Sequence, residues 1–193
     1  MKVCVDAGHG GSDPGAVGTD PFRLTEKEVT LQVSVLLEQE LEQRGHSVVM
    51  TRRRDRTLGL LPRARFANRL RADLFVSIHA NAAATASAEG IEVYHFPDSR
   101  EGRRTAVAVL QSLVTAFPDH RNRGVKEANF AVLRETKMPA ILIETEFITH
   151  PRQLAFLSDP ESQEALGEAV ADGLEAILNA PPTSSSYAYD ARS

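Results

Sequence analysis

Six short runs of apolar residues, rich in β-branched side chains, predict six β-strands along the chain. They cover residues 2–6, 47–51, 73–79, 90–96, 130–134 and 140–145. In two of these runs, at 74–76 and 140–143, consecutive residues are apolar, so both faces of those strands are expected to be buried. Such strands are typical of a parallel sheet that is covered on both sides.

Between the strands, apolar residues recur at the spacing of helical turns. Three amphipathic helices are predicted, carried by Val29, Val33, Leu36, Leu37 and Leu41, by Ala106, Leu110, Leu113 and Phe117, and by Leu166, Val170, Leu174, Ile177 and Leu178. At the start of the first helix, Thr25 and Glu28 fit a capping box, and Gly45 supplies its stop. Glu26 is then free for another role. Strands alternating with helices predict an α/β fold with a mostly parallel sheet, flanked by helices on both faces.

With 193 residues, 42% hydrophobic and 25% charged, the chain has the size and composition of one globular domain. We place this domain at residues 1–179, because residues 180–193 are rich in Pro and Ser and are expected to form a flexible tail. The formal net charge of −4 offers no overall basic field, so we expect no nucleic-acid partner. We expect the protein to be a monomer. The single cysteine, Cys4, excludes an internal disulfide.

The start of the chain has no apolar stretch of the length that a secretory signal needs. Nor does the sequence contain a run of about 18 apolar residues that could span a membrane. We therefore expect a protein that is made soluble in the cytoplasm, or one whose leader has been removed.

Polar residues with catalytic potential end three of the predicted strands. His9 follows the first strand, His79 ends the third and Glu144 lies near the end of the last. In an open α/β sheet, ligands bind beyond the carboxyl ends of the strands, so these side chains are expected to converge, with Glu26 close by. Two histidines, a carboxylate and an open position form a catalytic zinc set, and a further carboxylate is available as a base.

Three of these residues also have a structural interpretation. Taken alone, His9 is a polar loop residue, and His79 at a strand end is either a satisfied core residue or a ligand. Glu26 alone is a carboxylate that favours the positive end of a helix dipole. The remaining histidines, His46, His95, His120 and His150, are assigned to surface or turn positions. The arginine-rich run at 51–56 is a solvated loop, with a polyanion contact as the alternative. No serine or cysteine has the context of a covalent nucleophile.

The ordered motifs of the chain resemble those of the zinc-dependent N-acetylmuramoyl-L-alanine amidases of the type 3 (AmiC-like) group. The resemblance extends from Val3 to about Leu178. It is carried by VDAGHGGSDPGAVG (5–18), LTEKEVTL (24–31), Thr51–Arg52, ADLFVSIHANA (72–82), GIEVY (90–94) and NRGVKEANFAVLRETKMPAILIETEF (122–147).

The resemblance implies a twisted six-stranded sheet and cleavage of the amide between the lactyl group of N-acetylmuramic acid and L-alanine of the stem peptide. By position, it assigns one Zn²⁺ per chain to His9, Glu26 and His79, and the catalytic glutamate to Glu144. Peptidoglycan, as substrate and partner, comes from the resemblance alone. Two alternatives remain: a zinc peptidase or deacetylase that acts on another amide, and a non-catalytic wall-binding module.

The sequence departs from this family at Glu146, where a small residue is common, and at His150, where asparagine is frequent. Since alternate strand residues share a face, Glu146 is expected to lie beside Glu144, where it could line the cleft or compete as the base. Asp6 and Asn81 are candidates for orienting a ligand histidine or the substrate. We expect action on the cell wall, after release by lysis, a holin or delivery, or after export if a leader was trimmed.

Overall fold

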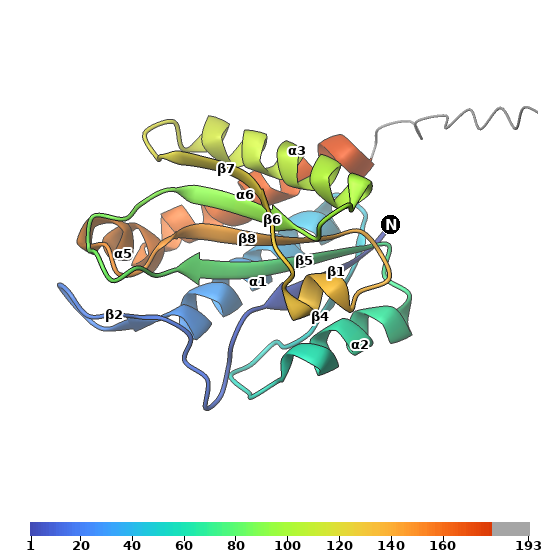
Figure 1. Cartoon of the computed structure of the whole chain (residues 1–193), viewed down its shortest axis with the longest axis horizontal. Helices are drawn as coiled ribbons and strands as arrows, with labels where there is room; N and C mark the ends of the chain where they lie inside the picture. The colour runs from blue at the N-terminus through green and yellow to red at the C-terminus, as the bar shows by residue number, and fades with distance from the viewer. Residues whose placement is uncertain (179–193) are drawn as a thin grey trace, which may run out of the picture.

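A six-stranded sheet forms the centre of the protein in a computed structural model that describes residues 1–178 (Figure 1). Its strands lie in the order β4-β1-β5-β8-β6-β7. Neighbouring strands are parallel except β6 and β8, which are antiparallel. The strands are β1 (Lys2–Ala7), β4 (Ser47–Met50), β5 (Leu74–Asn81), β6 (Ile91–His95), β7 (Asn122–Glu127) and β8 (Ala140–Phe147). A small antiparallel ribbon is formed by β2 (Val17–Gly18) and β3 (Leu24–Thr25).

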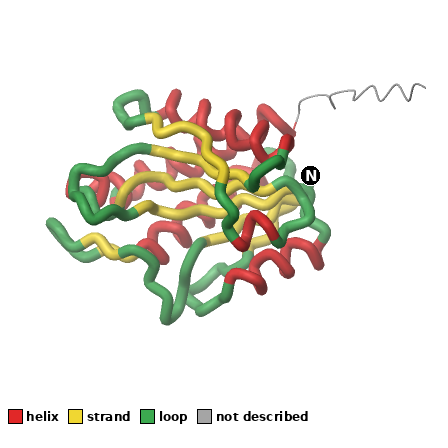
Figure 2. The backbone as a smooth tube through the Cα atoms, viewed as in Figure 1, coloured by secondary structure: helices red, strands yellow, loops and turns green. Residues whose placement is uncertain are grey.

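Helices cover both faces of this sheet (Figures 1 and 2). They are α1 (Glu26–Gln43), α2 (Leu60–Leu70), α3 (Arg100–Ala116), α4 (Ala131–Arg134), α5 (Pro151–Ser158) and α6 (Pro160–Leu178). One face is covered by α1, α3 and α6, with α6 packed against both of the others, and the other face is covered by α2 and α4. The predicted α/β class, with a mostly parallel six-stranded sheet between two helical layers, is confirmed.

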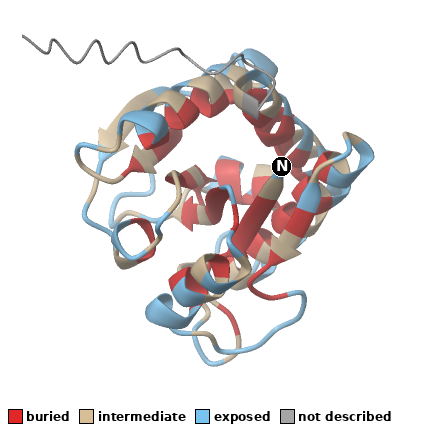
Figure 3. Ribbon diagram, turned by 90° about the vertical axis from the view of Figure 1, so that its right-hand side faces the viewer, coloured by how far each residue is buried: buried red, intermediate tan, exposed pale blue. Residues whose placement is uncertain are grey.

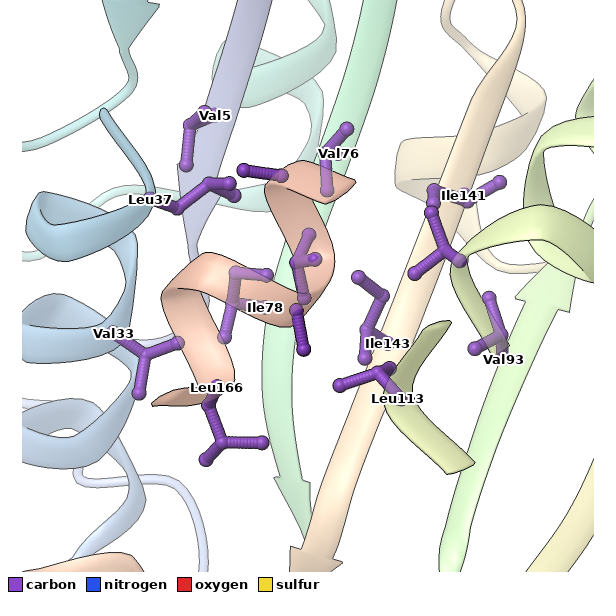
Figure 4. Close-up of a cluster of buried hydrophobic side chains, with 14 of the residues drawn as sticks. Val5, Val33, Leu37, Val76, Ile78, Val93, Leu113, Ile141, Ile143 and Leu166 are labelled. Atoms are coloured by element: carbon purple, nitrogen blue, oxygen red, sulfur yellow. The ribbon is translucent and has the colours of Figure 1, made fainter. Parts of the chain in front are cut away.

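The central strands supply alternate residues to two hydrophobic clusters on opposite faces of the sheet. In β5, Val76 and Ile78 join the larger cluster beneath α1, α3 and α6 (Figure 4), whereas Phe75 joins the smaller one beneath α2 and α4. In β8, Ile141 and Leu142 divide between the clusters in the same way. Figure 3 shows buried residues gathered along the sheet and the inner faces of its helices. Burial on both sides explains the consecutive apolar residues of these strands.

Five of the six predicted strands are present, with ends within two residues of those expected. The sixth prediction, at 130–134, is wrong: residues 131–134 form the short helix α4, which packs Val132 and Leu133 into the smaller cluster. A short apolar run fits a buried helical turn as well as a strand, and here the helix forms. The missing strand is β7, an edge strand whose sequence NRGVKE gives little apolar signal.

All three predicted helices are present as α1, α3 and α6. At the start of α1, the Glu28 carboxylate accepts a hydrogen bond from the Thr25 N–H at 2.9 Å, as expected of a capping box. The helix ends at Gln43, and Gly45 follows with a positive φ of 84°. Besides α4, two helices were not predicted, α2 and α5. In α2, arginines outnumber buried apolar residues, and Arg63 itself occupies a buried position, so the usual apolar periodicity is missing.

The proposed domain end at Asn179 and the predicted tail at 180–193 lie outside the described residues. Within residues 1–178, no helix has both the length and the apolar character needed to cross a membrane.

Candidate metal centre and active site

His9, Glu26 and His79 come together beyond the carboxyl ends of β1 and β5, at the start of α1. Glu26 Oε1 lies 3.1 Å from His9 Nε2 and 2.9 Å from His79 Nδ1. The potential ligand atoms of all three residues lie within 4.8 Å of one another. The three side chains that the sequence placed at this edge therefore form a group able to hold a metal ion.

The backbone around His9 allows this close approach. A Cβ on Gly8 would lie 2.5 Å from His79 Cε1, so a larger residue there would displace the ring. A Cβ on Gly15, whose φ is +64°, would lie 2.6 Å from Glu26 Oε2. His9 itself has a φ of +61°, a left-handed conformation that is uncommon for a residue with a side chain. The surrounding contacts must hold it there.

Those contacts come from several elements. Arg63 on α2 donates to the His9 carbonyl oxygen at 2.6 Å, and Asp13 Oδ2 lies 2.9 Å from His9 Nδ1. The backbone N–H groups of Ala16 and Ala80 donate to the two oxygens of Glu26, at 2.8 and 3.1 Å. Both the ring of His9 and the carboxylate of Glu26 are therefore fixed in orientation by groups outside the cluster.

The three residues also set one another's charge. Burial raises the pKa of the Glu26 carboxyl, but hydrogen bonds from His79 and His9 outweigh it and hold the pKa far below its usual range. Burial lowers the pKa of His9, but its contacts with Glu26 and Asp13 raise the pKa overall. Glu26 is therefore ionised at neutral pH, as a metal ligand must be.

Glu144 lies opposite this group, on the strand next to His79. The two residues are register partners in the β5–β8 pair, and both line a cavity of about 430 Å³ together with Glu26. Glu144 Oε2 is buried and has no hydrogen-bond partner among the described residues. Burial, and then the negative charges of Glu26 and Glu92, raise the pKa of the Glu144 carboxyl well above its usual value.

The rest of the cavity wall is mostly apolar. Leu60 at the start of α2 and Phe130 before α4 line it, and both are partly exposed at 57% and 39%. Leu142 lines it from the sheet. An apolar wall around a few convergent polar groups is the usual form of a small-molecule or polymer-binding cleft.

Glu92 on β6 was not identified from the sequence. It is 2% exposed and is the register partner of Glu144 across the antiparallel β6–β8 pair. Its carboxylate accepts hydrogen bonds from Asn81 Nδ2, Tyr94 Oη, Arg123 Nε and Lys126 Nζ. An acidic residue between two buried apolar strand positions signals a buried carboxylate that needs partners, and this signal was present at 91–93.

Of the candidate orienting residues, Asn81 lines the cavity and Asp6 does not. Asp6 is fully buried and accepts hydrogen bonds from Thr51, Arg63 and Ser77. It therefore reaches His9 only indirectly, because Arg63 also bonds to the His9 carbonyl oxygen.

The structure does not bring Glu146 to the cavity. The register shifts after the His79–Glu144 pair, so that Asn81 pairs with Phe147, and this bulge interrupts the alternation of faces along β8. Glu146 is fully buried; its oxygens accept hydrogen bonds from the N–H groups of Gly90 and Phe147, and Oε1 lies 2.9 Å from His120 Nδ1.

His120, assigned to a surface or turn position, is therefore a partly buried partner of Glu146. His150 has a local structural role, because its side chain accepts a hydrogen bond from the Arg152 N–H at the start of α5.

The chain is similar in sequence to known N-acetylmuramoyl-L-alanine amidases. The model of the N-acetylmuramoyl-L-alanine amidase family matches residues 3–176. The chain is 39% identical over 191 residues to the sporulation-specific N-acetylmuramoyl-L-alanine amidase of Bacillus subtilis, a match that covers 98% of this chain and 72% of that protein.

Solved structures agree with this match. The N-acetylmuramoyl-L-alanine amidase AmiC2 of Nostoc punctiforme superposes with a TM-score of 0.88 at 35% identity, covering 93% of this chain and 98% of that one. The catalytic domain of CwlV, an N-acetylmuramoyl-L-alanine amidase from Bacillus (Paenibacillus) polymyxa var. colistinus, gives a TM-score of 0.87 at 33% identity, covering 94% and 99%.

Proposed function

Since the chain belongs to the N-acetylmuramoyl-L-alanine amidase family, we propose that it cleaves peptidoglycan with a zinc centre at His9, Glu26 and His79 and with Glu144 as the catalytic base. The bond cleaved joins the lactyl group of N-acetylmuramic acid to L-alanine of the stem peptide. One observation supports these roles above all: the three potential ligands and the unpartnered oxygen of Glu144 line the same cavity.

The donor set fits zinc. Two imidazole nitrogens and one carboxylate oxygen within 4.8 Å of one another match the three protein ligands of catalytic zinc sites, whereas Mg²⁺ and Ca²⁺ favour oxygen ligands. The Asp13 carboxylate behind His9 resembles the outer carboxylates that orient metal-bound histidines. When bound, zinc would act as a Lewis acid and make water more acidic.

Glu144 would move the proton. Its Oε2 has no competing donor among residues 1–178, so it can accept a proton from the attacking water. It would then return that proton to the departing amine of L-alanine.

Asn81 would hold position at the edge of the same cavity. Its Nδ2 donates to Glu92 at 2.8 Å and its Oδ1 accepts a hydrogen bond from the Ala82 N–H at 2.8 Å, so both ends of the side-chain amide are held. Asp6 would act at a distance, by holding Arg63 under the His9 loop. We propose that the chain binds peptidoglycan as a monomer, at the cell wall.

The test is mass spectrometry of purified peptidoglycan after digestion, with and without a zinc chelator. We expect chelator-sensitive release of stem peptides with a free L-alanine amino terminus from intact glycan strands. Released amino acids or acetate would instead identify a peptidase or a deacetylase. Intact peptidoglycan in the presence of a zinc-loaded protein would identify a non-catalytic wall-binding module.

A further inference from the structure

Positive charge is concentrated in one segment of this acidic chain. Residues 51–72 contain eight arginines and one acidic residue, Asp55, although the whole chain carries a net charge of −4. Asp55 already accepts hydrogen bonds from Lys27 Nζ at 2.8 Å and from the Gly11 N–H at 2.6 Å. The segment therefore does not neutralise its own arginines.

Two of these arginines are buried and serve the fold. Arg63 forms an ion pair with Asp6 at 2.8 Å, and Arg52 donates to the carbonyl oxygens of Ala7 and Gly8. The other six are exposed: Arg53, Arg54, Arg56, Arg65, Arg69 and Arg71. Within residues 1–178, the only one of these six with a carboxylate partner is Arg53, which pairs with Glu38.

Five of these six arginines, all except Arg71, border a groove between the β4–α2 connection and α2. It consists of two hollows of about 540 and 320 Å³ that share Thr51, Arg56 and Phe66. Arg65 and Arg69 line the larger hollow, and no Asp or Glu among the described residues lines either one. We call this surface the arginine groove.

The arrangement of charge in the groove opposes stability. Arg65 and Arg69 lie one turn apart on α2, a spacing at which like charges repel. The Arg69 guanidinium lies 5.9 Å from the centre of the Phe66 ring, a cation–π contact that helps to hold it over the groove. Arg65 and Arg69, held together with no carboxylate partner among residues 1–178, form a surface suited to an anionic ligand.

The groove lies close to the catalytic cavity along the chain, because Leu58 and Pro62, which line the larger hollow, flank Leu60. Leu60, the first residue of α2, lines the catalytic cavity, and the β4–α2 connection is bonded to the His9 loop through Thr57 and Ser12. Along α2, Arg65 and Arg69 follow Leu60 by about 8 and 14 Å. Figure 1 shows α2 running along the outside of the sheet, away from the carboxyl ends of the strands. A polymer held in the cavity can therefore reach the groove.

We propose that the arginine groove is a second binding site for the substrate polymer and takes the carboxylates of a stem peptide next to the one being cleaved. This inference rests on the proposed function, because it takes its ligand from the substrate. Free carboxylates recur along peptidoglycan, and the planar guanidinium fork binds a carboxylate through two parallel hydrogen bonds. The groove would hold the chain on the polymer while the catalytic cavity selects the bond.

The test is binding to insoluble peptidoglycan that has been freed of phosphate polymers by acid. The full chain carries Glu144→Gln to stop hydrolysis, and co-sedimentation is measured over a range of salt concentrations. We expect Arg65→Gln with Arg69→Gln to raise Kd by about fivefold at low salt and to reduce the salt dependence. The charge-conserving pair Arg65→Lys with Arg69→Lys should keep most of the salt dependence.

A matched control removes the same charge elsewhere. Arg103 on α3 and Arg121 before β7 are exposed and have no carboxylate partner within residues 1–178, and α3 covers the opposite face of the sheet. Arg103→Gln with Arg121→Gln should leave binding close to that of the parent. Thermal unfolding of each variant verifies that it is folded.

Three results would overturn the inference. These are unchanged binding by the Arg65/Arg69 glutamine variant, an equal loss in the control, or undiminished binding to peptidoglycan whose carboxylates have been amidated. Binding that requires the phosphate polymers would reassign the groove to phosphodiesters. Because binding is measured without turnover, the two proposals can fail separately. If the groove variants bind as expected but the parent chain with Glu144 intact releases no stem peptides, the proposed function is refuted and the groove is not.

Discussion

Two glutamates face the same cavity in opposite electrostatic surroundings. Glu26 is held by two imidazoles and two backbone N–H groups, and the hydrogen bonds from the imidazoles lower its pKa despite burial. Glu144 has a buried oxygen without a hydrogen-bond partner among residues 1–178, and burial together with two nearby carboxylates raises its pKa. Burial acts on both side chains in the same direction, and the neighbouring groups decide the outcome.

This difference suits Glu26 to the role of a metal ligand and Glu144 to the role of a catalytic base. A carboxylate that stays ionised and is fixed by hydrogen bonds is suited to holding a cation, whereas one with a raised pKa and a free oxygen is suited to taking up and returning a proton. Variants that change either the Glu26 group or the Glu144 group, one at a time, test this difference.

The largest effect is expected on the ligand side. His79→Ala removes one of three proposed ligands and one partner of Glu26, so zinc and activity should be lost together. Zinc content by atomic absorption and release of stem peptides are measured on the same preparation. Full zinc occupancy in this variant would exclude His79 from the ligand set.

Glu144→Gln should impair catalysis without affecting zinc binding. The amide cannot accept the proton, so activity is expected to fall by about a hundredfold or more while zinc content stays unchanged. Turnover and zinc content are again measured together. Near-normal turnover would assign the proton transfer to another group, with Glu146→Gln as the next variant to test.

Glu92→Gln should change the pH dependence more than the maximal rate. The Glu92 charge raises the pKa of Glu144, and its removal also frees the cations Arg123 and Lys126, so both effects lower that pKa. The base is active when deprotonated. The acidic limb of the rate profile should therefore move to lower pH, and an unshifted limb would show that Glu92 does not act on the base.

The smallest effects concern the stability of the metal-free protein. A carboxyl with a raised folded-state pKa disfavours folding above its usual pKa, so Glu144→Gln should stabilise at pH 7, with the gain disappearing near pH 4. Glu26 has a lowered pKa, so Glu26→Gln should destabilise at pH 7, and this loss should shrink as the pH falls.

Denaturant unfolding at both pH values measures these signs. Glu28 provides a control in the same helical turn: its loss removes the capping box, and Glu28→Ala should cost about 1 kcal/mol without affecting zinc content. Equal signs for Glu26→Gln and Glu144→Gln would show that burial alone governs both carboxyls.

The sequence predicted much of this arrangement because strand ends are visible in the hydrophobic pattern. His9, His79 and Glu144 end or follow strongly apolar strands, and the parallel sheet then brings them to one edge. The β7 strand was missed for the opposite reason: this edge strand contains one apolar side chain, Val125, among polar and charged residues, so it has no apolar signature.

Glu146 shows where the strand pattern stops being informative. Spacing alone puts it on the face of Glu144, but the bulge beside Asn81 breaks the alternation, and Glu146 pairs with His120 from a distant part of the chain. A bulge depends on how two strands pair, and neither strand specifies it alone.

The sequence by itself determined the α/β class, the start of α1 and the residues available for a zinc centre, because these follow from local periodicity and from polar residues at strand ends. Only the tertiary structure decided which charged groups lie close enough to change one another's pKa. Glu92 is next to Glu144 through strand pairing, and the arginines of 51–72 form a groove through the packing of α2. Electrostatic interactions depend on distance in space, and distance in space is set by the fold.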